Sequence, residues 1–221
     1  MRGEKGLKLM AAIAWAALAL QLYLALEVRW NLGASLVGGL INVFSYFTVL
    51  SNTFAASVLS AAAWPRSTWA ARYLRRPAVA GCAVISMVLV GIAYNLLLRQ
   101  YWDPQGAQWL ANEVLHNIMP LAMLGFWWWR VPKGRLRLAH VLAWALYPLG
   151  WYGFTLLRGA SIGVWPYPFL DVAELGFART FVNALGLLAG YCGGGLALVA
   201  LDRYLGLRQV RPRRAASNLR P

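Results

Sequence analysis

The chain contains six apolar runs, each long enough to cross a lipid bilayer, and this feature limits the possible folds more than any other. The runs cover Leu7–Leu26, Leu36–Ala63, Ala78–Leu98, Gln108–Trp129, Leu138–Leu157 and Thr180–Leu201. A helix of about 20 residues spans a hydrocarbon core of about 30 Å. Lipid offers no partners to backbone polar groups, and the chain lacks the alternating pattern of barrel strands, so we expect six transmembrane helices.

The composition agrees with a membrane protein. Of the 221 residues, 60% are apolar and only 13% are charged, whereas about 25% of the residues in a soluble domain are charged. We therefore predict an all-α polytopic membrane protein. Residues 1–203 are expected to form the transmembrane domain, and residues 204–221 a basic, disordered tail.

The basic residues are distributed unevenly between the two sides of the predicted bundle. Three Lys and Arg lie before or at the start of the first run, four follow the second, four follow the fourth and six follow the last, whereas only four lie in the other connections. The positive-inside rule then places both termini in the cytoplasm. The net charge of +14 is thus attributed to topology and to contact with anionic lipid headgroups, and we predict no nucleic-acid partner.

The second run carries a polar stripe. At 100° per residue, Ser45, Thr48, Ser51 and Asn52 fall within an arc of about 120° on a helix. Polar groups at that depth are costly unless they face protein or a water-filled cavity, so each is a candidate for a functional site. The alternative interpretation is that the stripe only joins helices by hydrogen bonding, which is the commoner role of a Thr taken alone.

The fourth run carries a second polar face. Asn112, Glu113, His116 and Asn117 fall within an arc of about 140°. Pro120 leaves a backbone carbonyl without its helical donor at the level of His116, which predicts a kink there. The depth of Thr48 below the outer membrane surface, counted along its helix, is compatible with that of His116. We therefore expect the two residues to be neighbours.

Such a pair has a known chemistry. A hydroxyl becomes a nucleophile when a neighbouring base removes its proton, and a third group orients that base. Thr48 is the candidate nucleophile and His116 the candidate base. The candidates for orienting groups or oxyanion donors are Asn52, Asn95, Asn112, Glu113 and Asn117, and the sequence does not choose among them. Glu113 is as readily expected to pair with Arg99.

Two aromatic segments are expected to enclose this site. Tyr152 belongs to the aromatic outer half of the fifth run, which we expect to line a lipid-sized pocket. The outer loop from Arg158 to Glu174 contains Tyr167 and is stiffened by two prolines. Because this loop is also partly apolar, we predict that it covers the site as a lid.

Three segments in order resemble the signature segments of the androgen-induced membrane hydrolases. They are Tyr46-Phe-Thr48, Asn112-Glu-Val-Leu-His116-Asn-Ile-Met-Pro120 and Gly163-Val-Trp-Pro-Tyr167-Pro-Phe-Leu-Asp171. The resemblance implies a six-pass threonine hydrolase of fatty acid esters of hydroxy fatty acids. It places Thr48 at the nucleophile position and His116 at the histidine position. The basic, Ala-rich sequence is similar to a bacterial branch, which implies the bacterial inner membrane.

The sequence therefore predicts an intramembrane ester hydrolase whose lipid substrate enters from the bilayer. The alternative is a non-enzymatic protein that binds or transports a lipid or small molecule in the same polar cavity. A purely structural role ranks third. We expect no cofactor and no metal, since His116 and Glu113 lack a second histidine. The oligomeric state and the physiological ester are left open.

Overall fold

The computed structural model describes the backbone of residues 2–217 and the side chains of residues 4–208, and every secondary-structure element in this part of the chain is helical. The elements are α1 (Arg2–Asn31), α2 (Leu36–Val43), α3 (Phe47–Ala63), α4 (Trp69–Leu74), α5 (Pro77–Ala93), the π-helix η1 (Tyr94–Leu98), the 3-10 helix η2 (Arg99–Tyr101), α6 (Gly106–Glu113), the π-helix η3 (Val114–Ile118), α7 (Met119–Arg130), α8 (Leu138–Ile162), the 3-10 helix η4 (Pro168–Leu170) and α9 (Val172–Ser217). The predicted all-α class is confirmed.

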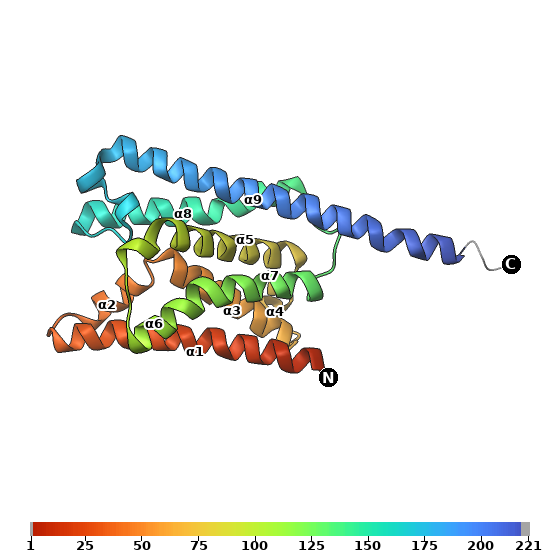
Figure 1. Ribbon diagram of the computed structural model, residues 1–221, viewed down its shortest axis with the longest axis horizontal. Coiled ribbons are helices and arrows are strands. Elements are labelled where there is room, and N and C mark those ends of the chain that lie inside the picture. The colour runs from red at the N-terminus through yellow and green to blue at the C-terminus, as the bar shows by residue number, and fades with distance from the viewer. Residues whose placement is uncertain (1, 218–221) are drawn as a thin grey trace.

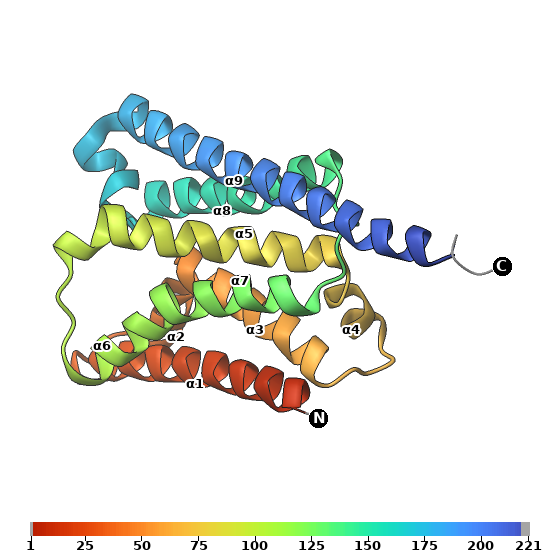
Figure 2. The ribbon, with the colours of Figure 1, turned by 45° about the vertical axis from the view of Figure 1, so that its right-hand side comes forward.

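The long helices lie side by side in one bundle, with α1 on one flank and α9 on the other (Figure 1). Helix α5 lies between them and packs against α3, α7 and α9. Every residue from Val79 to Met87 is buried, as expected of a helix that is apolar on all sides and surrounded by others. The two ends of the described chain lie at the same end of the bundle as α4 (Figure 2).

Three helical stretches within the described residues are long and apolar enough to cross a membrane, namely Glu4–Asn31, Pro77–Tyr101 and Val172–Arg208. The bent pair of α2 and α3 is a fourth if it is counted as one span. Helices α6 and α7 have only 8 and 12 residues, because η3 separates them. These apolar helices indicate an integral membrane protein.

The single helix expected from Leu36 to Ala63 is wrong. Helices α2 and α3 meet at an angle of 74° across the connection formed by Phe44, Ser45 and Tyr46. The Nε1–H of Trp151, on α8, donates to the carbonyl oxygen of Ser45 at 2.9 Å. The Ser45 hydroxyl donates to the carbonyl of Ile41 at 2.7 Å. Backbone groups released by a break must find partners inside an apolar layer, and these contacts supply some of them.

Two of the helices extend beyond the predicted runs. Helix α1 continues to Asn31, and α9 begins at Val172, with a non-helical Gly176 (φ 74°) inside it. Helix α9 continues to Ser217, through most of the segment predicted as a disordered tail. Residues 218–221 lie outside the described residues. The division of the chain at residues 203–204 stays a prediction.

We expect Trp151→Phe to destabilise the fold by about 1–3 kcal/mol, because it leaves the buried Ser45 carbonyl without its donor. The matched control is Trp69→Phe, since Trp69 is 71% exposed. Thermal unfolding of both variants in detergent measures the difference. Equal melting temperatures for the two variants would show that the Trp151 hydrogen bond does not stabilise the break.

Candidate functional site

Thr48 and His116 are in contact. Thr48 lies in the first turn of α3 and is 7% exposed, and its Oγ1 is 3.3 Å from His116 Nε2. His116 occupies the centre of η3. This distance is at the long end for a hydrogen bond, as is common for catalytic pairs before substrate binds. The structure thus brings together the two side chains that the sequence predicts to be neighbours.

A backbone carbonyl orients the imidazole. His116 Nδ1 lies 3.0 Å from the carbonyl oxygen of Asn112. A carbonyl can only accept, so Nδ1 carries the hydrogen and, in the neutral ring, Nε2 presents its lone pair to Thr48. The orienting group is therefore neither the Glu113 carboxylate nor an asparagine amide.

Tyr94 holds the other side of the imidazole, and sequence reasoning missed it. Its ring stacks on His116, with the centroids 4.2 Å apart. Its hydroxyl accepts a hydrogen bond of 2.6 Å from Nδ2 of Asn112, so the predicted residue Asn112 contributes to the site through both its backbone and its side chain. The only sequence signal for Tyr94 is its place beside Asn95 in the third run.

The π-helix around His116 follows from Pro120, which has no N–H to donate. The N–H of Met119 donates to the carbonyl of Val114, five residues earlier. The carbonyl of Leu115 is thus left without its usual helical donor. Asn52, which is fully buried, supplies one: its Nδ2 donates to the Leu115 carbonyl at 3.0 Å.

The same Asn52 amide also fixes α3. Its Nδ2 donates to the carbonyl of Thr48 at 2.9 Å. One side chain therefore ties the helix that carries Thr48 to the π-turn that carries His116. Asn52 is thus a positioning residue, although it contacts neither the Thr48 hydroxyl nor the imidazole in the described structure.

Tyr167 completes the polar part of the site. Its hydroxyl lies 3.3 Å from Thr48 Oγ1 and accepts a hydrogen bond of 3.4 Å from the Thr48 backbone N–H. Burial raises the pKa of Tyr167 to about 12, so the phenol remains protonated at neutral pH and can donate. The first-turn N–H groups of α3, those of Phe47 and Thr48, have no helical acceptors and form the positive end of the helix dipole.

The predicted lid loop lies over this site, and aromatic contacts hold it there. The Tyr167 ring stacks on Phe169 at 5.1 Å and meets Tyr46 edge-on at 5.6 Å and Trp151 at 5.8 Å between centroids. The Trp165 ring packs against Gly159, where a Cβ would overlap it. The loop is therefore positioned by apolar packing on α3 and α8.

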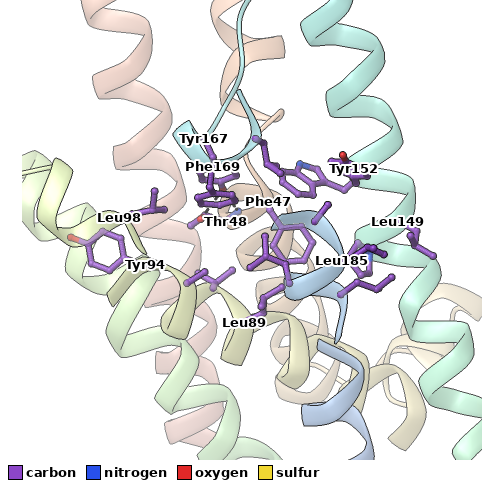
Figure 3. A pocket seen from close by; sticks show the side chains of 18 of the residues that line it. Phe47, Thr48, Leu89, Tyr94, Leu98, Leu149, Tyr152, Tyr167, Phe169 and Leu185 are labelled. Carbon is purple, nitrogen blue, oxygen red and sulfur yellow. Dashed lines mark hydrogen bonds between the residues drawn. The ribbon is translucent and has the colours of Figure 1, made fainter. Parts of the chain in front are cut away.

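An apolar cavity of about 120 Å³ adjoins Thr48. Figure 3 shows Thr48 and Tyr167 at one side of it, with Leu149 and Leu185 on the opposite side. Leu149 of α8 and Leu185 of α9, which line the cavity, are 45% and 47% exposed. The Tyr152 ring forms another part of the wall, and its buried hydroxyl has no hydrogen-bond partner among the described residues.

Three predicted orienting residues lie apart from the Thr48–His116 pair. Asn117 Nδ2 donates to Glu113 at 2.6 Å, and Asn95 Nδ2 donates to Asn117 at 2.7 Å. Arg99 then donates to Asn95 at 2.9 Å and pairs with Glu113 at 3.6 Å. The Arg99 side chain is 55% exposed, so this polar network reaches the surface of the bundle. Of the two interpretations of Glu113, the structure favours pairing with Arg99.

Comparisons with protein-family models, with curated proteins and with solved structures find no match to this chain. The resemblance to the androgen-induced membrane hydrolases therefore stays a prediction that rests on the three sequence segments.

We expect Asn52→Leu to destabilise the protein by about 2–4 kcal/mol, because two buried carbonyls lose the donor that they share. Thr53→Val is the matched control, since the Thr53 hydroxyl donates only within its own helix, to Val49. Thermal unfolding in detergent measures both. A loss no larger for Asn52→Leu than for Thr53→Val would contradict the role of Asn52 in joining α3 to η3.

Proposed function

We propose that the protein is an intramembrane hydrolase that cleaves lipid esters, with Thr48 as nucleophile and His116 as general base. The observation that carries the proposal is the 3.3 Å contact between Thr48 Oγ1 and His116 Nε2 beside an apolar cavity. The remaining parts of an acyl-transfer site are also present: an oriented base, donors for an oxyanion, and a covering loop.

In the first half of the reaction, Thr48 Oγ1 attacks the ester carbonyl carbon while His116 Nε2 accepts the hydroxyl proton. The Asn112 carbonyl, which accepts from Nδ1, stabilises the imidazolium that forms. The tetrahedral intermediate then collapses: the bond to the alkoxide oxygen breaks, and His116 Nε2 returns its proton to the leaving alcohol. The product of this half is an acyl ester on Thr48.

The oxyanion is stabilised at the start of α3. The Thr48 N–H now donates to the Tyr167 hydroxyl at 3.4 Å, a long bond that a developing oxyanion can replace. The oxyanion would then accept from this N–H and from the Tyr167 hydroxyl, near the positive end of the helix dipole. The broken helix matters here, because a continuous helix would have used these N–H groups in its own hydrogen bonds.

In the second half, water attacks the acyl carbon while His116 again accepts a proton, which it returns to Thr48 Oγ1 as the acid leaves. Water must reach a site surrounded by apolar helices. The surface network joins η1 to η3 through Arg99, Asn95, Asn117 and Glu113. Its member Asn117 directly follows His116 in the sequence. We propose this polar network as the route for water.

The substrate is an ester with a long acyl chain that enters from the bilayer. The cavity walls are mainly apolar, and Phe181 and Leu185 of α9, which line the cavity, are also 45% and 47% exposed. An acyl chain can therefore pass between α8 and α9 without crossing water. Fatty acid esters of hydroxy fatty acids, which the sequence resemblance implies, have this chemistry.

This proposal includes the six-span topology. Three of the six spans would be α1, α5 and α9. The other three would be the pair α2 and α3, the series α6, η3 and α7, and the helix α8. Both termini would lie in the cytoplasm. The ends of the described chain lie at one end of the bundle (Figure 1), as an even number of spans requires. The basic segments around Arg76 and Arg135 support a cytoplasmic position for that end, in a bacterial inner membrane.

A second candidate function is lipid binding without hydrolysis. The observation that favours it is the cavity wall, in which the polar side chains among the described residues are Thr48, three tyrosines and Trp151, with no charged side chain beside them. A binding protein needs the cavity but not the proton transfer. The two functions differ in what the Thr48 hydroxyl contributes, because binding of an acyl chain depends on apolar burial and turnover depends on the nucleophile.

We expect Thr48→Val to lower kcat/KM for a long-chain ester by at least about 10³-fold, because the nucleophile is absent. Thr48→Ser keeps a hydroxyl and should retain measurable turnover, and Thr53→Val is the matched control on the same helix. Hydrolysis by purified protein in detergent measures all three. Turnover by Thr48→Val equal to that of the unaltered protein would exclude Thr48 as nucleophile, and saturable lipid binding without any turnover would favour the second function.

We expect Tyr167→Phe to lower kcat by about 10–10²-fold with little change in KM, because it removes an oxyanion donor but keeps the aromatic ring. The control is Tyr46→Phe, since Tyr46 packs against Tyr167 and supplies no oxyanion donor. Steady-state kinetics with the same ester separates the two constants. A similar loss of kcat in both variants would assign Tyr167 a packing role only.

A further inference from the structure

The opposite end of the bundle holds a hollow that the proposed hydrolase does not use. It measures about 460 Å³ and is lined by the start of α5, the start of α8 and the loop that precedes α8. The lining residues are Arg76, Pro77, Ala78, Pro132, Arg135, Arg137 and His140. Four of these seven side chains are basic, and none is acidic.

The cations of this end fall into two groups. Lys133 Nζ donates to the carbonyls of Trp127 and Val131, each at 2.6 Å. Arg75 donates to the carbonyl of Arg66 at 3.1 Å, and Arg72 to that of Ser67. These three cations serve the backbone of their own end.

The second group consists of cations whose side chains have no such backbone partner, and the arginines of the hollow belong to it. Within the part of the chain that the structure describes, the guanidinium groups of Arg76, Arg135 and Arg137 make no hydrogen bond or ion pair, and Arg76 only lies over the Tyr73 ring at 5.3 Å. All three side chains are exposed at the hollow. Their donors are therefore free to bind an anion from outside.

A buried carboxylate fixes the direction of two of these arginines. Asp202 is fully buried, and its Oδ2 accepts a hydrogen bond of 2.8 Å from the N–H of Leu136. Arg137, directly after Leu136, has an extended backbone (φ −131°, ψ 155°). Leu136 is thereby held in the interior, whereas Arg135 and Arg137 on either side of it are exposed and line the hollow.

Two helix starts add further donors to the same hollow. Ala78 occupies the second position of α5, where its N–H has no helical acceptor. His140 Nδ1 accepts a hydrogen bond of 3.1 Å from the N–H of Arg137, so in the neutral ring its Nε2 carries the hydrogen and can donate. The positive ends of both helix dipoles add to the guanidinium charges.

From this placement we propose that the hollow binds a phosphate group. Planar guanidinium groups match the oxygens of phosphate in pairs, and a lone Lys ammonium does not. The proposal stands apart from the hydrolase site, which lies at the other end of the bundle. The phosphate has two possible sources, the headgroup of an anionic phospholipid and a soluble phosphate.

The test is titration of the purified full chain, in an uncharged detergent, with inorganic phosphate and separately with dioctanoyl phosphatidylglycerol, followed by calorimetry. Arg135→Gln/Arg137→Gln is compared with Arg66→Gln/Arg130→Gln, which removes the same charge from exposed arginines outside the hollow. We expect the first pair to weaken binding about tenfold and the second by less than about twofold.

Each outcome decides the proposal. Saturable binding of inorganic phosphate that depends on Arg135 and Arg137 supports it with a soluble source, and such binding of the lipid alone supports it with a headgroup source. Equal weakening by the two double variants would show that only the general surface charge attracts the anion, and it would overturn the proposal. Lack of saturable binding to either probe would also overturn it.

Discussion

A backbone N–H or C=O group inside an apolar layer must have a hydrogen-bond partner, and the candidate site exists because two helices are interrupted there. The first interruption lies between α2 and α3, where Trp151 satisfies the Ser45 carbonyl. The second is the π-turn around His116, where Asn52 satisfies the Leu115 carbonyl. Each interruption exposes backbone groups that a regular helix would hide. Asn52 also bonds to the Thr48 carbonyl and so holds the segments of Thr48 and His116 together.

The sequence predicts the part of this arrangement that depends on helical spacing. The polar stripes of the second and fourth runs, together with their depth, correctly place Thr48 beside His116. The break before Thr48 has no such signal, because the connection Phe44 to Tyr46 contains no Gly or Pro. Contacts with Trp151 and Tyr167, more than 100 residues away, accompany the break, and spacing along one helix does not reveal them.

The orienting groups were less predictable for a similar reason. An arc of about 140° groups Glu113 and Asn117 with His116 on a regular helix, but the π-turn adds a residue and changes the direction of the side chains within it. Asn117 and Glu113 bond to each other, and Glu113 pairs with Arg99 instead of His116. The group that orients the imidazole is a carbonyl, which every residue carries and which no sequence pattern can mark.

The central claim is that Thr48 is an activated nucleophile, and covalent labelling tests it most directly. The purified protein is treated with a fluorophosphonate probe, and the adduct is located by peptide mass spectrometry. The account predicts an adduct on Thr48 in the unaltered protein and a strong reduction of that adduct in His116→Ala. An adduct on another residue, or labelling of Thr48 that is unchanged in His116→Ala, would contradict it.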